Sequence, residues 1–246
     1  TLSHSKAVNK SLEICKSHID LIGFHGQTIF HNPEKKITKQ LGDGQLLSQL
    51  TKKKVVYNFR KNDLDNGGQG APLTPIFHNT LANKLSKKFN LSFPINILNI
   101  GGISNITSTI EYNDLDFEKK IYAYDIGPGN CLIDEWIRKN SKKKYDKEGS
   151  MARSGKTDKL VLNQVLENFT EYSDFKKSLD IKDFDIFFAK GLSLENGAAT
   201  ITDFTSELIT NGIKFTQNAQ NSSEKIWLVC GGGRKNKYLL ESIKNN

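Results

Sequence analysis

Two carboxylates stand beside a glycine-rich turn, and either of them could act as a general base. Asp63 and Asp65 lie in the stretch RKNDLDNGGQGAPLTP (60–75), which we expect to be a loop stiffened by its two prolines. A carboxylate held against such a turn can take a proton from water or from a hydroxyl group. By chemistry alone the two aspartates are equally eligible, and each could instead be an ordinary surface aspartate of a turn.

Five glycine turns follow short apolar runs, and such turns suit phosphate oxygens. They are HGQT (25–28), NGGQGAPL (66–73), IGGISN (100–105), DIGPGN (125–130) and VCGGG (229–233). Loops at the carboxyl ends of strands in an open α/β sheet line one crevice, where ligands bind. Because glycine has no Cβ, backbone N–H groups can approach a phosphate closely. We therefore expect the turns to converge on a shared pocket; the alternative is five structural turns.

Other polar residues near these turns allow two interpretations each. Asp125, expected at a strand end, could reach a magnesium-bound phosphate or cap the helix that starts near Cys131. Asn99 and Asn105 could bind phosphate or sugar, or merely close a hairpin. The stretch GSMARSGKT (149–157) resembles a phosphate-binding P-loop, but it has one residue too many and no strand before it. We interpret it as small-residue packing between helical segments.

Strands and helices alternate along the chain. Apolar runs predict strands at 19–24, 55–59, 95–100, 104–110, 121–124 and 226–230. Helices are predicted at 42–53 with Asp43 as N-cap, at 77–88, at 131–140 and over much of 146–215. This order indicates an α/β protein with a mostly parallel sheet and an antiparallel hairpin at 95–110. The pattern restarts near residue 91, so we expect domains at 1–90 and 91–246.

Composition narrows the classes of function. The 246 residues are 37% hydrophobic and 25% charged, and no apolar run approaches the roughly 20 residues of a membrane span. No signal peptide is recognisable, so we expect a cytoplasmic protein without a membrane partner. The net charge of +8 comes almost entirely from lysine, with arginine only at 60, 138, 153 and 234. This favours a solvated surface over a polyanion-binding face, and we expect no nucleic-acid partner.

The cysteines and histidines show no metal-ligand spacing. The three cysteines (15, 131 and 230) have apolar neighbours and are expected to be buried, reduced thiols. We therefore predict no metal site built from these side chains.

Taken together and in order, these segments resemble the anhydro-N-acetylmuramic acid kinase family. The resemblance covers nearly the whole chain, through IGFHGQTIFHNP, QLGDGQLL, NFRKNDLDNGGQGAPLTPIFH, ILNIGGISNIT, YDIGPGNCLIDEW, DKEGSMARSG, ENGAATITDFTSELI and VCGGGRKNKYLL. It implies two ribonuclease-H-like domains of the actin-like sugar-kinase superfamily, the N-terminal one incomplete, around a nucleotide cleft. It also implies a reaction in which water opens 1,6-anhydro-N-acetylmuramic acid while oxygen O6 takes the γ-phosphoryl group of ATP.

The resemblance assigns roles to residues of this chain. It identifies Asp63 as the base that activates water, ahead of Asp65. Arg60 would contact the lactyl carboxylate of the sugar, although an ion pair with Asp63 or Asp65 is the competing interpretation. The other sugar contacts would be His25, Gln27, Gly67 and Gly68. The nucleotide, as ATP with Mg²⁺, would meet Gly101, Gly102, Asn105, Asp125, Gly127 and Gly129, with Gly231, Gly232 and Gly233 near the adenosine.

The sequence also departs from the family pattern. A glycine-rich G-T-S-x-D-G hairpin has no match, the closing helices are missing, and Asn58 stands where aspartate is usual. We expect truncation at both ends, which would weaken ATP binding, and a homodimer is a further expectation from the family. The alternatives are a kinase for another sugar or acid, and a non-catalytic module that binds nucleotide or polyanion.

Overall fold

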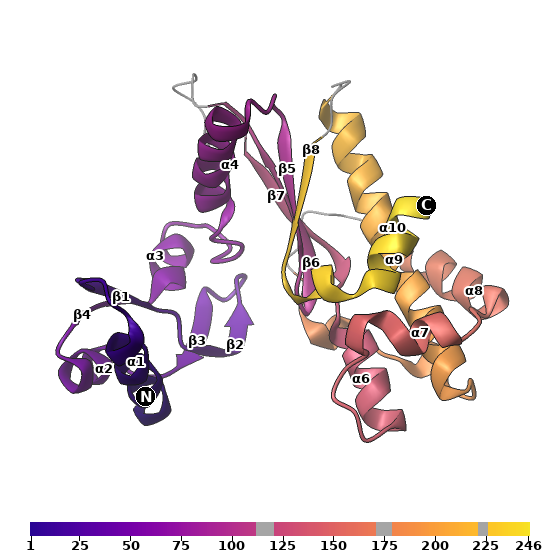
Figure 1. Ribbon diagram of the computed structural model, residues 1–246, viewed down its shortest axis with the longest axis horizontal. Helices are drawn as coiled ribbons and strands as arrows, with labels where there is room; N and C mark the ends of the chain where they lie inside the picture. Colours follow the sequence, from indigo (N-terminus) through magenta and orange to yellow (C-terminus); the bar gives the residue numbers. More distant parts are fainter. Residues whose placement is uncertain (112–120, 171–178, 221–225) are drawn as a thin grey trace. The chain divides into compact units, whose positions relative to one another are not determined.

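A computed structural model describes residues 1–111, 121–170, 179–220 and 226–246. These form two compact units, Thr1–Leu73 and Thr74–Asn246 (Figure 1). The division falls earlier than the expected boundary at 90/91, because helix α4 (Pro75–Phe89) packs within unit 2. The ring of His78 shares a 2.8 Å hydrogen bond with the Thr107 hydroxyl, and Asn83 donates to the carbonyl oxygen of Ile110.

Unit 1 contains two small sheets and three helices among its described residues. Its elements are α1 (Leu2–Ile14), β1 (Leu21–Phe24), β2 (Gln27–Asn32), β3 (Ile37–Leu41), α2 (Gly44–Thr51), β4 (Lys54–Tyr57) and α3 (Phe59–Asp65). Strands β1 and β4 pair in parallel, and β2 and β3 form an antiparallel hairpin that the sequence analysis missed. Asp43 is the N-cap of α2, as predicted, and its side chain accepts a hydrogen bond from the Leu46 amide.

Helix α3 replaces part of the predicted loop at 60–75. It follows Asn58, which has φ of 59°, a left-handed conformation that asparagine tolerates better than most residues. The side chain of Leu64 anchors the helix, because it is buried and lies against the position of Gly70. The glycines at 67–70 end the helix, and their turn signal concealed it in the sequence.

Unit 2 is organised around a four-stranded sheet in the order β7-β6-β5-β8. Its strands are β5 (Ile95–Ile100), β6 (Ile103–Thr109), β7 (Tyr122–Pro128) and β8 (Ile226–Cys230). The predicted hairpin of β5 and β6 is confirmed, because Gly101 and Gly102 permit the tight turn between them. The expectation of a mostly parallel sheet is wrong here: β7 pairs antiparallel with β6, and only β8 runs parallel to its neighbour β5.

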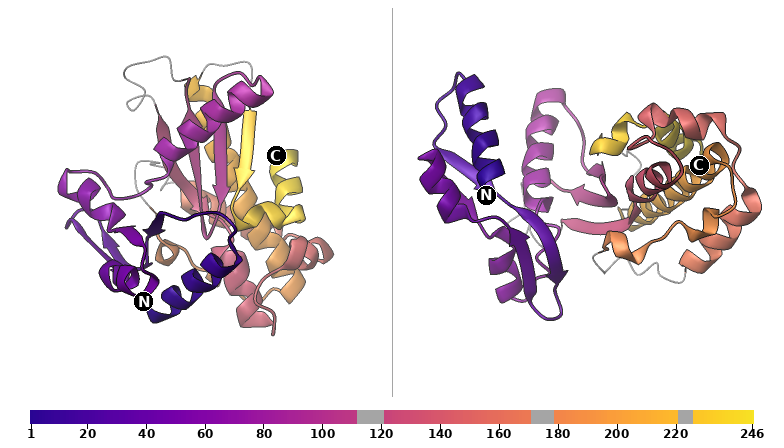
Figure 2. Two further views of the ribbon diagram at one scale, coloured as in Figure 1. Left: turned by 60° about the vertical axis from the view of Figure 1, so that its left-hand side comes forward. Right: turned by 90° about the horizontal axis from the view of Figure 1, so that it is seen from below.

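Helices cover both faces of this sheet. Helix α4 lies on one face, and α9 (Leu194–Gln220) with α10 (Lys237–Asn245) lies on the other (Figures 1 and 2). The core on the α9 side contains Ile106 and Ile126 from the sheet with Ile209 and Leu239 from the helices. The other helices among the described residues of unit 2 are α6 (Cys131–Asn140), α7 (Ser150–Ser154) and α8 (Lys159–Thr170). Short 3₁₀ turns lie at Lys147–Gly149, Ile181–Asp183, Phe187–Ala189 and Gly232–Lys235.

The stretch that resembles a P-loop is a packing element, as predicted. Helix α7 forms most of it, and the segment before it is helix α6 and a 3₁₀ turn rather than a strand. Buried Asp146 accepts hydrogen bonds from the amides of Met151 (2.9 Å) and Ala152 (3.0 Å), which fixes the start of α7. A side chain at Gly155 would collide with the Glu195 carbonyl group at the start of α9. Within the described ranges, no helix has the length and apolarity that a bilayer crossing needs.

Candidate functional site

The carboxylate of Asp63 is held by the glycine turn that follows its own helix. The Gly70 amide donates a 2.6 Å hydrogen bond to Asp63 Oδ2, and the Gly68 amide donates to the Asp63 carbonyl oxygen over 2.8 Å. A Cβ at Gly68 would collide with the carboxylate, so the turn can approach this closely only with glycine at that position. Asp63 is half-buried, which makes it a fixed and partly desolvated hydrogen-bond acceptor.

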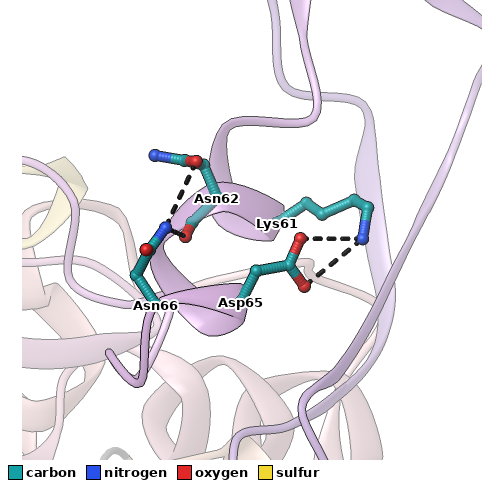
Figure 3. Close-up of polar contacts among 4 residues, drawn as sticks. All are labelled: Lys61, Asn62, Asp65 and Asn66. Atoms are coloured by element: carbon teal, nitrogen blue, oxygen red, sulfur yellow. Dashed lines mark hydrogen bonds and ion pairs between the residues drawn. The ribbon is translucent and has the colours of Figure 1, made fainter.

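Asp65 has a different environment, although it lies on the same helix. Its carboxylate is exposed and forms an ion pair with Lys61 one turn earlier, with Nζ 2.9 Å from Oδ2 (Figure 3). The same view shows Asn66 donating to the Asn62 carbonyl oxygen at the end of the helix. Exposed pairs of this kind contribute little free energy, and their carboxylates are solvated. The structure thus separates two aspartates that chemistry alone left equivalent.

Arg60 is a half-buried cation without an acidic partner among the described residues. Its Nε donates a hydrogen bond to His25 Nε2 over 3.0 Å, and His25 Nδ1 lies 3.0 Å from the Gly26 carbonyl oxygen. These contacts assign the proton of the His25 ring to Nδ1. Burial lowers the pKa of Arg60 below its ordinary value. The competing interpretation, an ion pair between Arg60 and Asp63 or Asp65, is therefore wrong.

Three glycine turns of unit 2 meet at one end of its sheet. The carbonyl oxygen of Gly101 accepts hydrogen bonds from the Asn130 amide (2.8 Å) and from Asn130 Nδ2 (3.0 Å), and Gly102 accepts from the Gly129 amide over 2.8 Å. Gly231, which follows β8, lies against the Ile100 carbonyl group at the end of the adjacent strand β5. The turns at 101–102, 127–130 and 231–233 therefore converge, as the sequence predicted for this part of the chain.

The converged turns line a pocket. It has a volume of about 480 Å³ and is formed within unit 2 by Gly101, Gly102, Asn130, Cys131, Asp134, Glu135, Arg138, Ile181 and Gly232. Gly102 is exposed, and a Cβ there would meet only the Ile181 side chain at ordinary contact distance. An open glycine turn next to the start of helix α6 is a suitable surface for phosphate oxygens.

Comparison with known proteins decides the family. Residues 2–246 match the family model described as anhydro-N-acetylmuramic acid kinase. The chain belongs to this family. It is 50% identical over 247 residues to the anhydro-N-acetylmuramic acid kinase of Pelagibacter ubique (strain HTCC1062), and the alignment covers 99% of this chain. The proteins of the same name from Methylobacterium nodulans and Agrobacterium fabrum are each 38% identical, over 100% and 99% of the chain. The chain spans 63% of the length of each of these relatives.

Several residues that we expected in the kinase site lie in other environments. Asp125 is inside β7 rather than at a strand end, and its Oδ2 accepts a 2.9 Å hydrogen bond from the Leu179 amide. It does not cap helix α6, whose N-cap is Asn130. Gly127 packs against Leu208 of α9, and Asn105 pairs with Asn99 across the β5–β6 hairpin. Contact of these residues with nucleotide stays a prediction.

The remaining expected sugar contacts in unit 1 stay predictions as well. Gln27 is exposed at the start of β2, and its Nε2 makes one long 3.5 Å contact with the Thr28 carbonyl oxygen. Gly67 has φ of 89° and open space around the position of a Cβ. Among the described residues, no hydrogen bond joins the Gln27 side chain to Arg60 or Asp63.

Two residues that line this pocket, Asn130 and Asp134, were not among the expected site residues. Both lie at the start of α6, four residues apart, directly after the DIGPG turn. Residues at this spacing share one face of a helix, and this spacing was the sequence feature that could have indicated these two residues.

The expectation of three buried thiols also needs correction, because Cys15 is exposed and only Cys131 is fully buried. Burial raises the pKa of Cys131 to about 11.

Proposed function

We propose that the protein is an anhydro-N-acetylmuramic acid kinase that opens 1,6-anhydro-N-acetylmuramic acid with water and phosphorylates O6 from ATP. The family assignment and the names of the relatives support this proposal. The products are N-acetylmuramic acid 6-phosphate, ADP and one proton. Such a reaction serves the recycling of cell-wall sugar.

In the proposed reaction, Asp63 is the base. Its carboxylate takes a proton from water, the water oxygen bonds to the anomeric carbon C1, and the bond between C1 and O6 breaks. Oxygen O6 attacks the γ-phosphorus of ATP, and ADP leaves. Asp63 then releases its proton to solvent. Each bond formed has its counterpart broken, and no oxidant or further reactant is needed.

The observation that carries this assignment is the contrast between the two aspartates of α3. Asp63 is half-buried and fixed by the Gly70 amide, whereas Asp65 is exposed and paired with Lys61. A general base must be held in place and must keep an oxygen available to its substrate. The Gly70 hydrogen bond occupies Oδ2 and orients the group for such a role.

Arg60 supports the choice of an acidic sugar as substrate. It is a half-buried guanidinium whose Nε is engaged by His25 and which has no acidic partner among the described residues. Its two Nη groups can form the bidentate contact that a carboxylate such as the lactyl group favours. In this proposal His25, Gln27, Gly67 and Gly68 complete the sugar site around Arg60.

Unit 2 supplies the nucleotide site in this proposal. The turn at Gly101 and Gly102 would hold phosphates, together with Asn105 and Gly129, and Gly231, Gly232 and Gly233 would lie near the adenosine. The strand order β7-β6-β5-β8, with two antiparallel pairs followed by a parallel strand, supports a ribonuclease-H-like fold for this unit.

Magnesium would enter with the ATP phosphates, where it neutralises charge on the transferred group. The described residues contain no group of three acidic, histidine or cysteine side chains that could hold a metal ion. In phosphoryl-transfer enzymes magnesium is usually held by phosphates and water with one or two carboxylates. Asp125 beside Asn105 is the candidate carboxylate, although its Oδ2 already accepts from Leu179.

The test is to incubate the full-length protein with 1,6-anhydro-N-acetylmuramic acid, Mg-ATP and ¹⁸O-labelled water. We expect a 6-phosphorylated product with ¹⁸O at C1, detected by mass spectrometry. Phosphorylation of another sugar without ¹⁸O at C1 would favour a different kinase of the superfamily. Salt-sensitive binding to nucleic acid without phosphate transfer would favour the non-catalytic module.

A further inference from the structure

Asp134 lies where two pockets of unit 2 adjoin. The pocket of about 480 Å³ beside Gly101 and Gly102 and a second one of about 260 Å³ are both lined by Asn130, Asp134 and Gly232. The second pocket continues to Tyr145, Lys235 and Asn236. Together they form an extended space that begins at the glycine turn and passes Asp134.

The carboxylate of Asp134 has no hydrogen-bond or ion-pair partner in the part of the chain that the structure describes. It is half-buried, and no donor of the described residues lies within hydrogen-bonding distance of its oxygens. Burial raises its pKa, and the charge of Arg138 one turn later opposes that shift without a direct ion pair. Its neighbour Glu135 differs, since it pairs with Lys139 at 2.6 Å. A partly desolvated carboxylate without donors is costly, unless a ligand brings the donors.

We propose that Asp134 accepts hydrogen bonds from the ribose hydroxyl groups of the nucleotide. This inference rests on the proposed nucleotide site in unit 2. With the phosphates at Gly101 and Gly102, the sugar of the nucleotide lies farther along the same space, beside Gly232. A vicinal diol offers two donors, and an ionised carboxylate offers two acceptor oxygens. Acidic residues hold ribose hydroxyls in the same way in dinucleotide-binding folds.

The second pocket then receives the base. Tyr145 offers an aromatic ring there, and Lys235 and Asn236 offer polar groups. Asn236 is itself engaged, because its side chain caps helix α10 by accepting from the Leu239 amide. Asp134 is thus the residue through which the pocket distinguishes a ribonucleotide from a nucleotide without hydroxyl groups.

The test compares the binding of ATP and 2′,3′-dideoxy-ATP to the full-length protein by calorimetry, without the sugar. We expect the wild type to bind ATP about tenfold more tightly, a typical value for hydrogen bonds to a charged group. In Asp134→Ala the two affinities should agree within about twofold, because only the ATP complex loses hydrogen bonds. Asp134→Asn, which keeps the shape and one acceptor, should retain part of the preference.

Glu241→Gln is the control, since it removes one negative charge from unit 2 at an exposed carboxylate that pairs with Arg153 and lines neither pocket. It should keep the wild-type preference for ATP. The inference is refuted if the wild type binds both nucleotides equally, or if Asp134→Ala weakens both by the same factor, as a role in metal binding or folding would. Absence of any ATP binding by the wild type would instead refute the proposed nucleotide site, and this inference with it.

Discussion

Arg60 donates a hydrogen bond from Nε to His25 Nε2 over 3.0 Å, and this contact joins helix α3 to the turn after β1. Because His25 is anchored in turn by its contact with the Gly26 carbonyl oxygen, the plane of the guanidinium group is fixed from one side. Among the described residues no acceptor engages the Nη groups, so they are available for a ligand. A fixed guanidinium with available Nη groups and no acidic partner among the described residues is suited to bind a carboxylate in a defined orientation.

Replacing Arg60 by lysine should weaken sugar binding specifically. Lysine keeps the charge but loses the planar fork, so we expect the KM for the anhydro-sugar to rise by roughly 10- to 100-fold. The KM for ATP should change by less than about twofold, since Arg60 contacts no nucleotide in the proposal. Steady-state kinetics of the full-length protein measure both values. Lys61→Met is the control, because it removes only the exposed pair with Asp65.

His25→Ala should act in the same direction with a smaller effect. It removes the anchor of Arg60, so we expect a KM for the sugar that rises by about tenfold. A 1,6-anhydro-sugar without the lactyl group provides the decisive comparison. If the wild type prefers the lactyl sugar and both variants keep that full preference, the role of Arg60 is wrong.

Replacing Asp63 by asparagine should abolish turnover. We expect kcat to fall by at least about 10³-fold, because the amide cannot take the proton of water. Asparagine retains an oxygen for the Gly70 amide, so the turn should keep its conformation and ATP affinity should stay within about twofold. Calorimetry with ATP and a turnover assay separate these two quantities. Asp65→Asn, the matched control, should keep near-normal turnover, whereas near-normal turnover of Asp63→Asn would falsify the assignment of the base.

Helix α3 shows which features of the candidate site could be predicted from the sequence. The glycine turn and both aspartates were evident, but the spacing of Lys61 and Asp65 becomes an ion pair only once the segment is known to be helical. The glycines and prolines of this stretch indicated a loop. The single buried apolar residue Leu64 gave no helical periodicity that could have predicted the helix. The contact of Arg60 with His25 joins residues 35 positions apart, and no local spacing encodes it.

In the sheet of unit 2, the β5–β6 hairpin was predictable from the sequence, but the direction of β7 was not. The β5–β6 hairpin was predictable because a double glycine between two apolar runs specifies a tight turn. The direction of β7 depends on tertiary pairing, so the sequence could not supply it. For the same reason Asn130 was noticed as part of a motif, but its hydrogen bonds to Gly101 were not.

Thiol labelling should distinguish the cysteines. At pH 8 we expect iodoacetamide to modify exposed Cys15 in the native protein, while buried Cys131 should react only after unfolding. With a pKa of about 11, Cys131 is ionised in roughly one molecule per thousand at that pH. Mass spectrometry of peptides with and without denaturant measures the extents. Rapid native labelling of Cys131 would contradict its burial.

The pKa of Cys131 also predicts how stability depends on pH. In the unfolded chain the thiol ionises near its ordinary value of 9, and in the folded protein near 11. Below pH 9 the thiol keeps its proton in both the folded and the unfolded state, so it adds no pH dependence to the free energy of unfolding. Between pH 9 and 11 the thiol is ionised in the unfolded state but not in the folded state. This stabilises the unfolded state, so the free energy of unfolding should fall. Between pH 9 and 11, the free energy of unfolding measured with a denaturant should decline less steeply for Cys131→Ala than for the wild type. Equal declines for the wild type and the variant would contradict the raised pKa of Cys131.

Two glycines of the converged turns should respond differently to alanine. A Cβ at Gly129 would collide with the Gly101 carbonyl group, whereas a Cβ at Gly102 would meet only Ile181 at ordinary distance. We therefore expect Gly129→Ala to reduce the free energy of unfolding by about 1–3 kcal/mol. Gly102→Ala should leave stability within about 0.5 kcal/mol but weaken ATP binding, since the methyl group stands where phosphate oxygens would approach.

Chemical denaturation and calorimetry with ATP on the full-length protein measure the two effects. The two effects should be separate, because a Cβ at Gly129 would collide with the backbone whereas the space beside Gly102 is open to a ligand. If Gly102→Ala binds ATP as well as the wild type, the phosphates do not bind at this turn. In that case the order of phosphate, ribose and base along the pockets of unit 2 would have to be abandoned as well.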